Sequence, residues 1–97
     1  MKSNRMHRLR RALLAALYEY DSYQDLDTVL CNPAVICVNP SPEEARTEWK
    51  NLREWGLTDA LAGYGGSVCR LSAFVRKAME ETGNPPRDER LWGYGVC

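Results

Sequence analysis

Residues 41–72 combine a helix start, a helix stop and a glycine-rich turn, and they constrain the fold more than any other stretch. Ser41 is followed by Pro42 and then by Glu44, the pattern of a capping box with proline at the first helical position. Gly56 supplies a residue that ends a helix in the left-handed conformation. One face of the segment is apolar, with Ala45, Trp49, Leu52 and Gly56 in register. The spacing predicts an amphipathic helix from Ser41 to Trp55.

The segment after this helix has the pattern of a β-hairpin. Leu57–Ala62 and Val68–Ser72 are short, and they flank a tip that is rich in glycine. The tip consists of Gly63, Tyr64, Gly65, Gly66 and Ser67. Glycine adopts positive φ without steric cost, so it suits such a turn. Alternation in the returning strand should direct Cys69 and Leu71 inward and leave Arg70 on the outer face.

The amino-terminal segment predicts a helix from Asn4 to about Tyr20. Its apolar residues recur at helical spacing and form one buried stripe: Leu9, Leu13, Ala16, Leu17 and Tyr20. Leu14 and Tyr18 lie four residues apart on another face. This second face either packs against the carboxyl-terminal segment or forms the seam of a homodimer.

The connecting segments carry weaker signals. Asp25–Asn32 is expected to form a short helix that Asn32-Pro33 ends, and the β-branched run Ala34–Val38 is expected to form a strand. Ser72 is expected to begin a last helix, which ends near Thr82 with Phe74, Val75, Ala78 and Met79 available for burial. In the tail after it, Leu91, Trp92 and Tyr94 are expected to dock on the core.

A chain of 97 residues predicts one domain, 1–97, divided into a basic arm (1–6), a core (7–82) and a docked tail (83–97). The 13 basic and 13 acidic residues cancel, so no global field attracts the chain to nucleic acid or to an anionic membrane. The positive charges near the amino terminus include Arg5, Arg8 and Arg11. They either contact phosphates or form a solvated helix face.

The first residues resemble a secretory signal, but the apolar run is short and leads directly into Glu19 and Asp21. We therefore interpret it as part of a helix, and we expect a cytoplasmic protein with no membrane partner. The four cysteines form no CxxC pair. Without a secretory context we expect free thiols, buried at Cys31 and Cys69 and terminal at Cys97.

The sequence S-P-E-E-A-R-T-E-W-K-N-L-R-E-W-G-L, a glycine-rich turn and then C-R-L-S resembles winged helix-turn-helix proteins over residues 7–82. Within that family it is most similar to small prophage-type or transcription-regulator-like modules. The resemblance implies an α+β fold with a three-helix core, a small antiparallel hairpin as the wing and a C-terminal helix. It also implies that helix 41–55 enters the major groove of double-stranded DNA and that tip 63–67 lies along phosphates or the minor groove.

Carried onto this chain, the resemblance implies that the DNA-binding residues are Arg46, Thr47, Lys50 and Asn51 for bases, with Arg70, Arg5, Arg8 and Arg11 for phosphates. Tyr64 either stacks on a sugar or a partner surface, or folds back over Trp55. Glu43, Glu44 and Glu54 lie on the same helix, and carboxylates near phosphates oppose binding. A protein-interaction or dimerisation module without nucleic-acid binding is therefore the alternative function.

Catalysis requires a nucleophile–base pair, a carboxylate dyad or a metal cluster, and the sequence predicts none of them. The chain has a single histidine, His7, so zinc-ligand spacing is missing. The GYGGS tip lacks the Lys-Ser/Thr of a P-loop. We expect a protein that is not an enzyme and that uses no cofactor, metal or small-molecule ligand.

Overall fold

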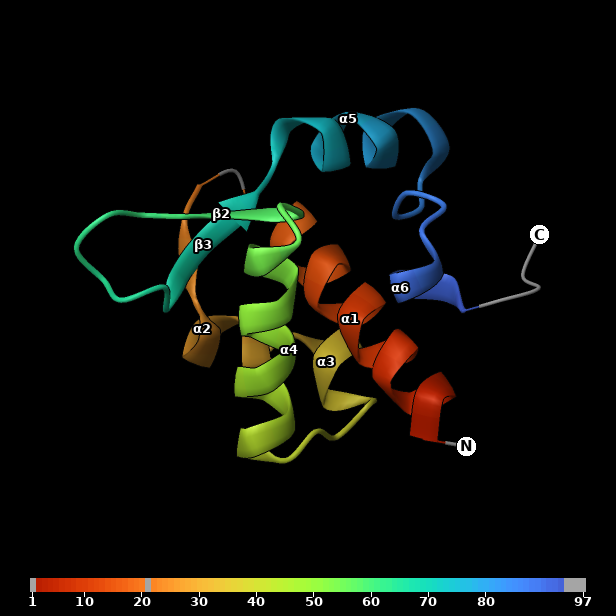
Figure 1. The fold of residues 1–97 in the computed structure, drawn as a ribbon, viewed down its shortest axis with the longest axis horizontal. Coiled ribbons are helices and arrows are strands. Elements are labelled where there is room, and N and C mark those ends of the chain that lie inside the picture. Colours follow the sequence, from red (N-terminus) through yellow and green to blue (C-terminus); the bar gives the residue numbers. More distant parts are fainter. Residues whose placement is uncertain (1, 21, 94–97) are drawn as a thin grey trace.

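The computed structural model describes residues 2–20 and 22–93, with side chains from residue 5 onward, as an α+β domain with a three-stranded antiparallel sheet (Figure 1). In chain order its elements are α1 (Lys2–Tyr18), β1 (Gln24–Asp25), α2 (Leu26–Leu30), α3 (Pro33–Ile36), α4 (Pro42–Glu54), β2 (Thr58–Ala60), β3 (Val68–Leu71), α5 (Ala73–Thr82) and α6 (Glu89–Trp92).

Helix α1 lies at the centre of the molecule, where it contacts α2, α3, α4, α6 and β3. Leu9, Leu13, Ala16 and Leu17 of its predicted stripe are buried, and Tyr20 is half-buried. Leu14, which was assigned to another face, is buried as well. The helix begins at Lys2. Residues 2–6, which were expected to form a basic arm, therefore belong to α1, and Arg5 is held there by Glu44.

The expected strand over Ala34–Val38 is wrong, because this segment forms the short helix α3. The Asn32 side chain accepts a hydrogen bond from the Ala34 N–H at 3.0 Å, and Pro33 occupies the first helical position. Asn-Pro therefore starts a helix here as well as ending one. Val35 and Val38 are buried three residues apart, a helical spacing that outweighs the strand preference of β-branched residues.

The sheet has the strand order β1-β3-β2, and both pairs are antiparallel. The hairpin prediction is confirmed, since Thr58 pairs with Leu71 and Ala60 with Cys69. The third strand comes from Gln24 and Asp25, which pair with Cys69 and Val68. Only two residues long, β1 was not predicted, because so short a strand has no periodicity of its own.

Helix α4 has the boundaries that its caps predict. The Ser41 hydroxyl accepts from the Glu44 N–H, and the Glu44 carboxylate accepts from the Ser41 N–H, so the capping box is complete. At the other end Gly56 has φ +76°, and the Leu57 N–H donates to the Leu52 carbonyl at 3.0 Å. This closing bond is that of a Schellman motif.

Helix α5 lies across one end of the molecule in Figure 1, and of its side chains Val75 and Met79 are buried. Phe74 was expected to be available for burial but is 55% exposed.

The tail docks as predicted for the residues that are described. Leu91 is fully buried and Trp92 is partly buried, whereas Tyr94 lies outside the described residues. Arg11 binds the Leu91 carbonyl at 2.7 Å and stacks over the Trp92 ring at 4.4 Å. Arginine guanidinium groups on α1 therefore hold the tail through both hydrogen bonds and cation–π contacts.

Candidate functional site

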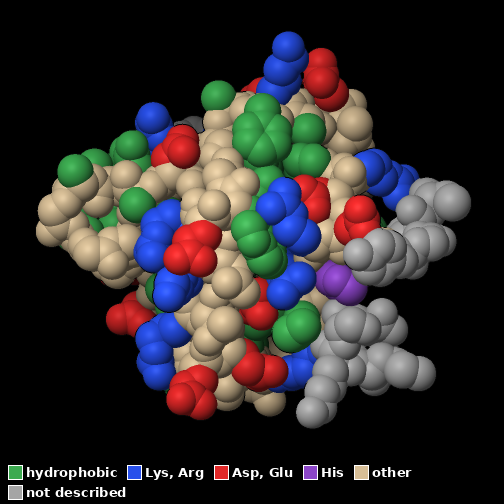
Figure 2. All heavy atoms as spheres, viewed as in Figure 1, with side chains coloured by type: hydrophobic (Ala, Val, Ile, Leu, Met, Phe, Trp, Pro, Cys, Tyr) green, Lys and Arg blue, Asp and Glu red, His purple; other side chains and the backbone are tan. Residues whose placement is uncertain are grey.

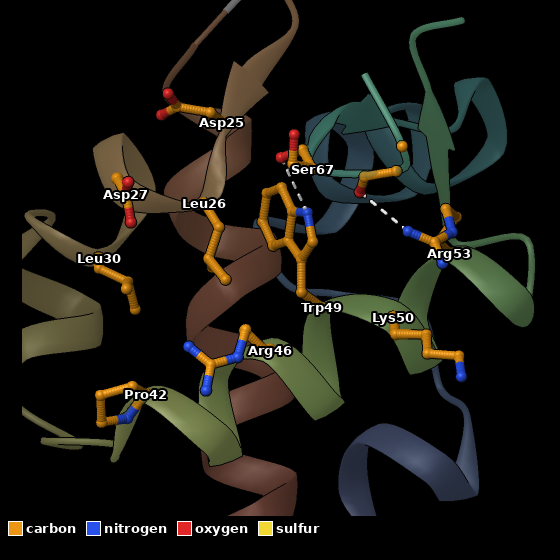
Figure 3. A pocket seen from close by; sticks show the side chains of 12 residues that line it. Asp25, Leu26, Asp27, Leu30, Pro42, Arg46, Trp49, Lys50, Arg53 and Ser67 are labelled. Carbon is orange, nitrogen blue, oxygen red and sulfur yellow. Dashed lines mark hydrogen bonds between the residues drawn. The ribbon is translucent and has the colours of Figure 1, made fainter. Parts of the chain in front are cut away.

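A surface groove of about 530 Å³ lies between α2, α4 and the β2–β3 loop. Its apolar lining includes Leu26, Leu30, Pro42 and Trp49. Its charged lining consists of Asp25, Asp27, Arg46, Lys50 and Arg53, and the loop contributes Gly65, Gly66 and Ser67. Figure 3 shows these side chains arranged around the groove, with the α4 residues on one side and Leu26, Asp27 and Leu30 of α2 opposite them.

Two α4 side chains fasten the β2–β3 loop to the helix. The Trp49 Nε1–H donates to the Ser67 carbonyl at 3.1 Å, and the Arg53 Nη1–H donates to the Gly66 carbonyl at 2.9 Å (Figure 3). Gly66 has φ +85°, and a Cβ atom there would lie 1.8 Å from Arg53 Nη1. Glycine at this position therefore permits both the turn and the close approach of the guanidinium group. Helix and loop form one surface.

The α4 wall of the groove is cationic. Arg46, Lys50 and Arg53 follow one another at i, i+4 and i+7, so they form one ridge along the helix. Arg46 and Lys50 are exposed, and Arg46 makes no ion pair or hydrogen bond within residues 2–20 and 22–93. Thr47 is exposed beside this ridge and faces a second hollow against α1.

Acidic groups share the same region. Asp25 and Asp27 line the groove across from Arg46, and Lys50 pairs with Glu54 at 3.9 Å. Hydrogen bonds from the Thr28 side chain and from its backbone N–H hold the pKa of Asp25 below the ordinary value, so this carboxylate stays ionised. Figure 2 shows basic side chains in a column along α4 with acidic side chains among them. The groove is therefore dipolar: its α4 wall is positively charged and the wall with Asp25 and Asp27 is negatively charged.

The structure does not bring the amino-terminal arginines into this groove. Arg5 pairs with Glu44 at 3.1 Å and donates to the carbonyls of Val38 and Asn39. Arg11 is bound to the tail, as described above. Arg8 is exposed, but it borders a different hollow near Trp92. Arg5 and Arg11 both make hydrogen bonds that stabilise the fold, and their contact with phosphates remains a prediction.

Asn51, which was predicted to contact bases, and Arg70, which was predicted to contact phosphates, have different environments. Asn51 is half-buried, and its side-chain amide donates to Glu48 Oε1 at 3.2 Å. Arg70 is exposed while Cys69 and Leu71 are buried, which confirms the predicted alternation. The Arg70 guanidinium stacks over the Tyr23 ring at 4.7 Å. Arg70 does not line the groove but projects from the outer face of the sheet.

Tyr64 at the loop tip is 56% exposed. The side chains stacked on Trp55 are instead Arg10 and Arg90, each 4.9 Å from the ring centroid. Tyr64 is therefore available at the loop tip. Gly63, Gly65 and Gly66 all have positive φ, as the tip requires.

Leu14 and Tyr18, the expected tail-docking or dimer face, are used inside the domain. Leu14 has no exposed surface, so its side chain is not accessible to a second chain. Tyr18 is half-buried, and Arg76 of α5 lies over its ring at 5.4 Å. This face is covered by the chain itself.

Several side chains that form or support the groove were not predicted from the sequence. The loop clamp of Trp49 and Arg53 was not predicted, although Arg53 completes the i, i+4, i+7 spacing with Arg46 and Lys50. Leu26 lies half-buried in the groove, where it follows the unpredicted strand β1. The buried pair of Arg10 and Glu48, 2.6 Å apart, was also missed, because neither residue type suggests burial.

Within residues 2–20 and 22–93 no group of three or more His, Cys, Asp or Glu side chains is placed to hold a metal ion. No helix of that part of the chain is long and apolar enough to cross a bilayer. Cys69 is buried as expected, whereas Cys31 is exposed, because Asn32 occupies the inward position at the end of α2. Cys97 lies outside the described residues. His7 is half-buried on α1, where burial and the neighbouring Arg10 and Arg11 lower its pKa.

Comparison of the chain with protein-family models, with curated proteins and with solved structures gives no match. Any function assigned to the groove must therefore be argued from its residues.

Proposed function

We propose that the chain is a winged-helix DNA-binding protein that acts in transcription regulation. The element order supports this proposal: helix, short strand, helices, a capped helix and a hairpin, with the first strand beside the last in a β1-β3-β2 sheet. In this interpretation α4 is the helix that enters the major groove, and the β2–β3 loop is the wing.

The observation that carries the proposal is the fixed relation between α4 and the loop. Arg46, Thr47 and Lys50 are exposed on the helix, and Trp49 and Arg53 hold the loop base against the same helix. A DNA duplex with α4 in its major groove would then contact the β2–β3 loop at a fixed distance from the helix. Tyr64 and Arg70 would lie near its backbone.

The carboxylates of Asp25, Asp27 and Glu54 limit the affinity, because each opposes phosphate approach. Three cations, Arg46, Lys50 and Arg70, remain for phosphate contacts. We therefore expect weak, salt-sensitive binding, with log K falling against log salt with a slope of about −3.

The test is retention of a fluorescent duplex at tens of micromolar protein and about 50 mM salt, conditions that detect ordinary non-specific binding. The double variant Arg46→Ala/Lys50→Ala should weaken binding about tenfold. It should also make the slope of log K against log salt shallower by about 2, because two phosphate contacts are lost. Arg8→Ala is the matched control, since it removes one exposed arginine outside the groove and should leave binding unchanged. No retention of duplex by the wild-type chain would contradict the proposal.

The dipolar character of the groove favours a second candidate, a protein-interaction module that keeps this architecture without binding nucleic acid. Asp25 and Asp27 oppose the cationic α4 wall, and Leu26, Leu30 and Pro42 give the groove apolar surface. Such a lining suits a peptide with both charges better than a polyanion. Retention of duplex by the wild-type chain separates the candidates, because the second one predicts none. If duplex is retained, Asp27→Lys tests the groove itself: it should strengthen retention if DNA occupies the groove and leave it unchanged if DNA binds elsewhere.

A further inference from the structure

Helix α5 carries an exposed stripe that no described part of the chain covers. Phe74, Lys77 and Glu81 are exposed at i, i+3 and i+7, with the half-buried Ala78 between them. Phe74 is one of the few large apolar side chains in residues 5–20 and 22–93 that are more than half exposed. In Figure 1 the helix lies across one end of the molecule, with one long side facing solvent.

The charges of α5 are arranged against its own helix dipole. The first turn contains no acidic residue and the last turn no basic residue, while Lys77 precedes Glu80 and Glu81. Cations near the amino terminus and anions near the carboxyl terminus both destabilise an isolated helix. Lys77 and Glu81 are also four apart in the less favourable order, lysine first. The Ser72 side chain accepts no cap hydrogen bond, and its hydroxyl donates to the Gly56 carbonyl at 2.6 Å.

We propose that the Phe74–Lys77–Glu81 stripe of α5 binds the same stripe of a second copy of this chain, with the two helices antiparallel. An antiparallel arrangement sets the acidic carboxyl-terminal half of each helix against the basic amino-terminal half of the other. It therefore reverses the unfavourable charge order that each helix has alone.

The spacing of the stripe suits a two-fold axis between residues 77 and 78. With a rise of about 1.5 Å per residue, Lys77 of one copy is offset by about 4.5 Å along the axis from Glu81 of the other, within reach of its side chain. Phe74 of one copy is then level with Glu81 of the other and about 4.5 Å along the axis from its Ala78, whose small side chain leaves room for the ring. Each dimer then contains two Lys77–Glu81 pairs and two buried phenylalanines.

The association should be weak. A helix of 10 residues presents less surface than the ~800 Å² per partner of a standard interface, so we expect a dissociation constant of about 10–100 µM. The inference does not depend on what the α4 groove binds, because α5 contributes no residue to that groove.

The test is sedimentation equilibrium of the full chain from about 5 to 500 µM, a range that brackets the expected constant. The wild-type chain should pass from monomer to dimer, and Phe74→Asp should remain monomeric. Because Phe74 is exposed, this variant should keep its circular dichroism spectrum, and the new carboxylate in the first turn of α5 should keep the thermal midpoint from falling. Lys50→Glu is the control for a charge reversal elsewhere on the surface and should leave the association unchanged.

A charge exchange between two variants identifies the pairing itself. Lys77→Glu and Glu81→Lys should each weaken self-association about tenfold, because each places like charges in contact. An equimolar mixture of the two should associate like the wild type, since all contacts between the two different chains are then opposite in sign. Effects within one helix cannot produce this recovery. A monomeric wild type at about 500 µM, or a mixture no more associated than its components, would overturn the proposal.

Discussion

Helices α4 and α5 are stabilised in opposite ways. Helix α4 has a complete capping box, acids in its first turn, Arg53 in its last turn and a Schellman closure. Helix α5 has no side-chain cap and charges that oppose its dipole, and its glycine C-cap is the one favourable end signal that it shares with α4. A helix whose end N–H and C=O groups are capped by its own residues can expose polar side chains for binding. A helix without such caps depends for its stability on the surfaces that pack against it.

The largest expected effect concerns the buried face that attaches α4 to α1. Glu48→Ala should lower the free energy of unfolding by about 3–5 kcal/mol, because it leaves the Arg10 guanidinium buried without its carboxylate partner. Urea denaturation measures this change. The double variant Arg10→Met/Glu48→Leu should recover most of the loss, since apolar residues of similar volume replace a buried pair at little cost. A loss of less than about 1 kcal/mol in Glu48→Ala would show that Arg10 is satisfied by the tail alone.

A smaller effect compares the helix dipoles directly. Glu43→Lys places a cation in the first turn of α4 and should destabilise the domain by about 0.3–1 kcal/mol. Glu80→Lys places a cation near the end of α5 and should stabilise it by a similar amount. Thermal unfolding in dilute solution at low salt measures both. Shifts of the same sign for the two variants would contradict the contrast drawn between the helices.

The smallest expected effect is the pH dependence of the α4 cap. The hydrogen bond from Arg5, together with that from the Ser41 N–H, lowers the pKa of Glu44 to about 2. A carboxylate whose pKa is lower in the folded state stabilises the fold above its unfolded pKa, near 4.5, and this contribution is lost as the pH falls toward 2. Both side chains are about 40% exposed, so solvent reduces the effect.

Glu44→Gln tests this assignment. The variant should unfold more easily than the wild type at pH 6, and the difference should shrink as the pH approaches 2 and the wild-type carboxylate becomes protonated. Denaturant midpoints measured across that interval give the comparison. A difference that stays constant with pH would mean that Glu44 contributes through its shape rather than its charge.

The amino-acid sequence by itself determined the elements whose signals are local. The Ser41–Glu44 box, Gly56 and the glycine-rich tip set the ends of α4 and of the hairpin, because caps and turns depend on residues within a few positions of one another. The apolar stripe of α1 was also readable from its spacing. Local chemistry failed at residues 33–38, where β-branched residues favoured a strand and the Asn32 cap with buried Val35 and Val38 produced a helical turn.

Only the tertiary structure decided how the charges are used. Arg5, Arg8 and Arg11 look equivalent in the sequence. In the structure Arg5 binds Glu44, Arg8 is exposed and Arg11 binds the tail, because each faces a different neighbour around α1. The groove likewise needs Asp25, Arg46 and Gly66 to meet from segments far apart in the chain. Contacts of this kind depend on packing over long sequence separations, which no local pattern specifies.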